Sequence, residues 1–110
     1  MARTLVNLPP APKKGDVIEV RTLIAHPMET GYRPGADGKV LARDLIRRFS
    51  CLVDDGNSRE LVFQMELYPS IAANPYLTFP LLVTGAGTLI LTWEGDNGFS
   101  QTETVALRAT

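Results

Sequence analysis

Short runs in which apolar and polar residues alternate, each ended by turn-forming residues, constrain the fold of this 110-residue chain more than any other feature. The clearest run is residues 16–25, where every second residue from Ile18 to Ile24 is apolar or threonine, and Glu19 and Arg21 stand between them. A repeat of two residues turns successive side chains to opposite faces of a β-strand. Residues 16–25 are therefore predicted to form a strand with one buried face.

The same alternation recurs along the chain between clusters of glycine, proline, asparagine and aspartate. It predicts further strands at residues 4–8, 43–54, 59–67, 76–84, 87–94 and 99–108. The two-residue gap Gly85-Ala86 predicts a hairpin between its flanking strands, and the turn at residues 95–98 predicts another. Proline cannot donate a hydrogen bond to a neighbouring strand, so residues 9–12 predict that the first strand lies at a sheet edge, and Pro80 predicts an edge or a bulge.

About seven short strands without a sustained helical stripe predict an all-β fold, an immunoglobulin-like β-sandwich of antiparallel strands. A partly open barrel is the alternative. A chain of this length is expected to form one domain, residues 1–110, with a single core. The residues predicted to face that core are Leu45, Phe49, Cys51 and Val53, then Leu61, Phe63, Met65 and Leu67, then Leu77, Phe79, Leu81 and Val83, and finally Leu89, Leu91 and Trp93.

Composition argues against several function classes. Eleven basic and twelve acidic residues give a formal net charge of −1, so we expect no nucleic-acid partner and no anionic-membrane partner. The only cysteine, Cys51, cannot form a disulfide within the chain. The first residues lack the apolar run of a Sec-type signal and no later segment is long enough to span a bilayer, so we expect a soluble chain without its own signal.

A polar connection after residues 16–25 is the first place to look for a working surface. Residues 27–39 contain two prolines and three glycines, and a loop of this composition, with His26 at its start, is expected to be exposed to solvent. His26, Glu29 and Asp37 have the residue types of a general base and its orienting carboxylate, but no nucleophile is near, and a structural role for His26 is favoured. No spacing of histidine, cysteine and carboxylates fits a known metal site, so we expect no metal and no cofactor.

Three further features admit both a functional and a structural interpretation. Cys51 alternates in step with Phe49 and Val53 on the apolar face of its strand, which favours a buried structural thiol over a reactive one. Arg43, Arg47 and Arg48 provide either an anion or partner patch or a solvated face. The segment Asn74-Pro75-Tyr76 either presents a ring to a partner or caps the core beside a turn, and the second is favoured. No phosphate-binding glycine loop, nucleophile elbow or Cys-x-x-Cys pair is present, so the chain is not expected to be an enzyme.

The segment His26-Pro-Met-Glu-Thr-Gly-Tyr-Arg33 resembles the H-x-M-E-S/T-G-x-R motif of the SoxZ family, the small subunits of the bacterial sulfur-oxidation (Sox) carrier complex. Asn74-Pro75-Tyr76 and Asp96-Asn97-Gly98 follow in the order of the family, and the resemblance covers about residues 15–105. Pro27 departs from the basic or polar residue that is expected after the histidine in this family.

The resemblance implies a non-catalytic scaffold that forms a heterodimer with SoxY, whose C-terminal Gly-Gly-Cys-Gly-Gly arm carries sulfur intermediates of thiosulfate oxidation. It also implies transient contacts with other Sox enzymes, a periplasmic location, and export as a complex with SoxY. The residues that it suggests for partner binding or arm presentation are His26, Met28, Glu29, Arg33, Asn74 and Tyr76. The alternatives are a stand-alone enzyme or redox protein that uses His26 or Cys51, and a structural β-sandwich that forms a homodimer when isolated.

Overall fold

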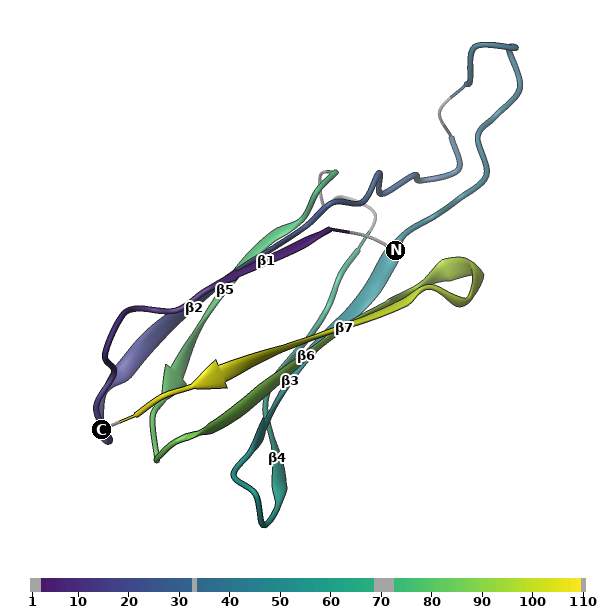
Figure 1. Cartoon of the computed structure of the whole chain (residues 1–110). Helices are drawn as coiled ribbons and strands as arrows, with labels where there is room; N and C mark the ends of the chain where they lie inside the picture. The colour runs from purple at the N-terminus through teal and green to yellow at the C-terminus, as the bar shows by residue number, and fades with distance from the viewer. Residues whose placement is uncertain (1–2, 33, 69–72, 110) are drawn as a thin grey trace.

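The computed structural model describes residues 3–32, 34–68 and 73–109, and in them seven strands form two sheets packed face to face (Figure 1). The strands are β1 (Thr4–Asn7), β2 (Val17–Ile24), β3 (Ile46–Asp54), β4 (Arg59–Glu66), β5 (Tyr76–Leu82), β6 (Gly87–Gly95) and β7 (Ser100–Leu107). One sheet has the order β1-β2-β5 and the other β4-β3-β6-β7, with all neighbours antiparallel. The predicted immunoglobulin-like β-sandwich is confirmed, and the barrel alternative is wrong.

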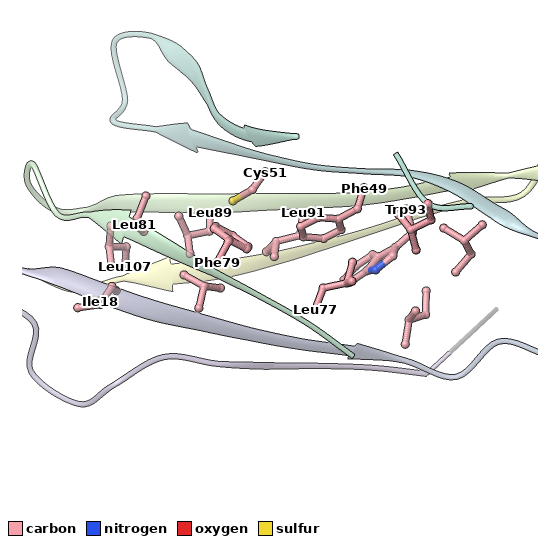
Figure 2. Packing of buried hydrophobic residues seen from close by; sticks show 14 of the residues in the cluster. Ile18, Phe49, Cys51, Leu77, Phe79, Leu81, Leu89, Leu91, Trp93 and Leu107 are labelled. Carbon is pink, nitrogen blue, oxygen red and sulfur yellow. The ribbon is translucent and has the colours of Figure 1, made fainter. Parts of the chain in front are cut away.

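The core lies between the two sheets and is built from the side chains that alternation placed inward (Figure 2). In β2 and β5 every second side chain is buried, as predicted. The ring of Phe49 lies 5.1 Å from that of Trp93 and 5.8 Å from that of Phe79 in the opposite sheet, and Phe79 stacks on Phe63 at 4.5 Å. Burial of one phenylalanine side chain contributes about 1.5–3 kcal/mol. This aromatic cluster therefore holds the two sheets together.

The predicted hairpin between β5 and β6 is wrong. β5 pairs with β2, whereas β6 pairs with β3 and β7, so residues 83–86 carry the chain from one sheet to the other. Strands in opposite sheets of a sandwich also turn every second residue into the shared core, so alternation alone cannot distinguish the two arrangements. The hairpin between β6 and β7 is confirmed, with the short 3-10 turn η1 (Asp96–Gly98) between the strands. β1 lies at a sheet edge as predicted, and so does β5, which contains Pro80.

Leu61 was predicted to face the core but points to solvent, because β4 contains an extra residue. Cys51 of β3 lies opposite Phe63, and the next residue, Leu52, lies opposite Leu61, so the register passes over Val62. One extra residue exchanges the two faces of a strand beyond that point. Val62 consequently packs against the core, and Leu61 is 51% exposed.

The described residues of the connection between β2 and β3, 25–32 and 34–45, project beyond the sandwich as a narrow two-armed extension, here called the finger (Figure 1). Isolated bridges between Glu29 and Asp44 and between Pro34 and Val40 join its two arms. The finger is longer than the predicted loop, since residues 43–45 were expected to begin a strand. The loop predicted between β4 and β5 lies partly outside the described residues, which omit 69–72.

Candidate functional site

Four of the six suggested site residues come together at the base of the finger, where it leaves the sandwich. The backbone N–H of His26 donates to Oδ1 of Asn74 at 2.9 Å, and the Asn74 N–H donates to the carbonyl of His26 at 2.7 Å. The backbone N–H of Glu29 donates to the carbonyl of Asp44, and the N–H of Asp44 donates to the carbonyl of Glu29, both at 2.8 Å. Asn74 has a φ of 54°, which asparagine adopts more readily than most residues. Asn74 thus ties the end of β2 to the start of β5.

His26 is buried, and its ring holds the finger in shape. Its Nδ1 accepts the backbone N–H of Met28 at 3.0 Å, so the neutral ring carries its proton on Nε2. Nε2 lies 3.5 Å from Oδ1 of Asp44, without the geometry of a hydrogen bond. The ring also meets Phe99 edge-on at 5.1 Å. The carboxylate beside His26 is therefore that of Asp44, whereas the sequence suggested Glu29 or Asp37.

Met28 turns back into the core. Its φ of 52° is rare for a residue other than glycine, and its Sδ accepts the backbone N–H of Ile46 at 3.3 Å. His26 and Met28 are only 5% and 6% exposed, so the expectation that both lie on a solvent-exposed loop is wrong. The backbone turn brings Met28 into the core cluster, and the ring of His26 is covered by Phe99.

A second cluster holds the returning arm of the finger. Oδ2 of Asp96 accepts Nε of Arg43 at 3.0 Å and the N–H of Leu45 at 3.1 Å, while Nη1 of Arg47 lies 3.5 Å from Oδ1. Burial raises the pKa of Asp96, but the hydrogen bonds from Arg43 and Leu45 and the two arginine charges outweigh it, so the pKa falls below its usual value. A Cβ at Gly95 would collide with the carbonyl of Leu45, so glycine is needed for this close approach.

The arginines of the predicted patch are balanced by carboxylates. They line an open hollow of about 410 Å³ whose charged residues are Arg43, Arg47, Arg48, Glu66 and Glu94. Arg48 lies opposite Glu66 on one neighbouring strand and Glu94 on the other, and Asp96 pairs with the remaining two arginines. The hollow consequently has no excess of positive charge for an anion.

A comparison with known families decides the membership of the chain. The family model described as "Sulphur oxidation protein SoxZ" matches residues 6–106. The chain belongs to the SoxZ family. It is thus a component of a sulfur-oxidation (Sox) system. No curated protein matches it in a sequence comparison.

Solved structures similar to this SoxZ-family chain include several superoxide reductases. The enzyme (Neelaredoxin) from Ignicoccus hospitalis aligns with a TM-score of 0.76 and 17% identity over 99% of this chain and 82% of that chain. A putative superoxide reductase from Thermotoga maritima aligns with a TM-score of 0.68 and 12% identity over 97% of this chain and 85% of that chain. The superoxide reductase from Nanoarchaeum equitans aligns with a TM-score of 0.65 and 13% identity over 94% of this chain and 90% of that chain. Identities this low show a shared fold alone.

The SoxZ motif that begins at His26 has a structural explanation over most of its length. Gly31 has a φ of 91°, and a Cβ there would lie 3.2 Å from Cβ of Arg43 in the opposite arm. Together with His26, Met28 and Glu29, this glycine shapes the base of the finger. Arg33, the last motif residue, lies outside the described residues.

Tyr76 lies apart from this cluster. It is 59% exposed on the outer face of β5, opposite Leu23 of β2, so the favoured interpretation of a tyrosine that caps the core is wrong. The sequence also missed the role of Asp96, which was recognised only as part of a turn. Its partner Arg43 is 53 residues away along the chain, and no local pattern reports such a contact.

Cys51 is fully buried, and burial raises the pKa of its thiol to about 12. The thiol is therefore protonated at neutral pH, as the structural interpretation predicted. In the part of the chain that the structure describes, no three histidine, cysteine, aspartate or glutamate side chains gather as metal ligands. The same residues include no helix of the length and apolarity that a membrane span requires.

Proposed function

We propose that this chain is a non-catalytic scaffold subunit that pairs with SoxY and forms the sulfur-compound carrier complex of thiosulfate oxidation. In this complex it helps present the C-terminal cysteine arm of SoxY to other Sox enzymes. The match of residues 6–106 to the SoxZ family carries the proposal. The complex acts in the periplasm, and the chain is exported together with SoxY.

The state of the chemically reactive side chains supports a scaffold over a stand-alone enzyme or redox protein. His26 is 5% exposed and its Nδ1 is occupied by the Met28 N–H, so the ring is not available to a substrate. Cys51 lies in the core with a raised pKa, whereas a nucleophilic or redox-active cysteine needs access and a thiolate. Both residues that the enzyme hypothesis requires are thus used to build the sandwich and its finger.

The finger supports a role in presentation. Its base is held from both sides by the His26 and Asp96 clusters, while Tyr32 and Val40 beyond them are 87% and 61% exposed. A projecting segment that is ordered before it binds loses less conformational entropy on contact with a partner. The finger therefore offers an aromatic and an aliphatic side chain to the other Sox enzymes in turn, without first having to fold.

Co-expression tests the pairing. The chain is produced with SoxY that carries an affinity tag, and the purified material is analysed by gel and by mass photometry. We expect a one-to-one complex. Recovery of SoxY alone would contradict the proposal. A Cys51→Ser variant is the control for the enzyme alternative, because a scaffold keeps sulfur oxidation in a reconstituted assay when this thiol is lost.

Fractionation tests the location. With a complete SoxY, both chains should appear in the periplasmic fraction. With SoxY that lacks its signal, both should remain in the cytoplasm. Export of this chain in cells without SoxY would contradict joint export.

A further inference from the structure

Exposed large hydrophobic side chains are concentrated on the outer face of the β1-β2-β5 sheet. Nine such residues are exposed in the described part of the chain, and five of them lie on this face. The five are Leu5, Val17, Leu23, Tyr76 and Leu82. On the outer face of the other sheet only Leu61 belongs to this set. Concentrated apolar exposure on one sheet marks a surface that a partner covers.

The strand register aligns these side chains into rows. Leu5 lies opposite Leu23, and Leu23 lies opposite Tyr76, so one row crosses all three strands. We call these three residues the Leu5 row. Val17 and Leu82 lie opposite each other at the other end of the face. The Leu5 row is at the end of the sheet from which the finger departs, since β2 leads from Leu23 into the finger.

The charges between the rows cancel. Nε of Arg21 donates to Oε1 of Glu19 at 2.7 Å, and both side chains belong to β2. A face that carries one neutralised ion pair between apolar rows is complementary to an uncharged, apolar protein surface. Anionic membranes and nucleic acids need excess positive charge, which this face lacks.

Both edges of this sheet are protected, so a partner has to cover the face. Pro80 has no N–H to donate at the β5 edge. At the β1 edge, Oγ1 of Thr4 donates to Oε2 of Glu103 in β7 at 2.8 Å, which brings the two sheets together on that side. Addition of a peptide strand to either edge is therefore disfavoured.

The size of the face indicates a folded partner. The three strands contain 4, 8 and 7 residues, and at about 3.4 Å per residue and about 4.8 Å between strands they give a flat area of roughly 300 Å². A standard interface buries about 800 Å² of accessible surface on each partner. The partner must thus cover the whole face and its rim, which a folded domain does and a single peptide strand does not.

We infer that the outer face of the β1-β2-β5 sheet, centred on the Leu5 row, is the surface on which SoxY docks through an uncharged, apolar face of its folded domain. The inference rests on the proposed function and adds the binding surface. The outer face of the β4-β3-β6-β7 sheet remains free. It is lined by Ser50, Gln64, Thr92 and Thr102, and the hydroxyl groups of Thr92 and Thr102 hydrogen-bond to each other at 3.2 Å.

The test uses variants of the complete chain and purified SoxY. Leu5→Lys and Tyr76→Lys change the Leu5 row. Leu61→Lys is the matched control, because Leu61 is 51% exposed and Leu5 is 54% exposed, but on opposite sheets. Thermal unfolding establishes that each variant is folded, and Tyr76→Ala, which introduces no charge, replaces a row variant that is not. Affinity for SoxY is then measured by titration calorimetry.

Each Leu5-row variant should weaken the affinity by about tenfold or more, since central interface residues contribute at least about 1–2 kcal/mol, and Leu61→Lys should change it by less than about threefold. Row variants that bind like the wild type while Leu61→Lys does not would overturn the docking face and leave the proposed function intact. A wild-type chain that does not bind SoxY would overturn both. A homodimer of the isolated chain that SoxY cannot displace and that the row variants dissociate would assign the face to a second copy and overturn the inference.

Discussion

His26 stabilises the base of the finger in two ways: its Nδ1 accepts a hydrogen bond and its ring is buried. Substitutions of His26 separate these two contributions to the free energy of unfolding. His26→Phe keeps a ring against Phe99 but removes the acceptor of the Met28 N–H, which lies 3.0 Å from Nδ1. A buried donor without a partner costs about 1–3 kcal/mol, so the free energy of unfolding should fall by that amount. His26→Asn keeps an acceptor, because an asparagine side chain reaches the N–H two residues ahead, but it loses the buried ring. It too should be destabilised by about 1–3 kcal/mol, through the apolar area that is lost.

The two variants are distinguished by amide hydrogen exchange, combined with urea unfolding for the free energies. In His26→Phe the Met28 amide should lose protection, whereas in His26→Asn it should keep it. Tyr32→Phe, which changes an exposed ring of the same finger, is the control and should alter neither measurement. An unchanged free energy of unfolding and a protected Met28 amide in His26→Phe would refute the role assigned to Nδ1.

Three further predictions concern the finger and the core. Gly31→Ala should destabilise the protein more than Gly38→Ala in urea unfolding: both positions have positive φ, which costs alanine about 1–2 kcal/mol, but only at Gly31 does the new Cβ also meet Arg43 at 3.2 Å. The Cys51 thiol should not react with a thiol reagent until the protein unfolds. Because its pKa is raised from 9.0 to about 12, its contribution to stability is complete below pH 9 and declines as the pH rises toward 12, which alkaline unfolding measurements check. The pKa of Asp96 is lowered, so its contribution is present above its usual pKa of 3.8 and is lost as the pH falls below that value; Asp96→Asn should flatten this acid dependence of stability and increase amide exchange at Leu45.

The strands were predictable from the sequence because their signal is local. Alternation depends only on neighbouring residues, and it identified the buried side chains of β2 and β5 without error. It failed where one extra residue, Val62, shifts the register between β3 and β4 and so turns Leu61 outward. It also failed to separate the two sheets, because the inward pattern is the same for strands that pair and for strands that face each other across the core.

The base of the finger was not predictable, because its contacts are distant in sequence or depend on one backbone angle. Asn74 bonds to His26 across 48 residues, and Asp96 bonds to Arg43 across 53. Met28 lies in a segment with the composition of a loop, yet its φ of 52° turns its side chain into the core. Composition therefore suggested exposure where the structure has burial.

The burial of His26 and Met28 changes how the SoxZ motif relates to binding. Buried residues cannot contact a partner, so their effect on affinity acts through the fraction of molecules that are folded. Apparent affinity falls only in proportion to that fraction. Affinity for SoxY in His26→Phe should therefore recover under conditions that stabilise the fold, whereas Tyr76→Lys should lose affinity at unchanged stability, because Tyr76 is exposed on the proposed docking face. Parallel measurement of stability and affinity in these two variants separates the residues that shape the finger from those that touch the partner.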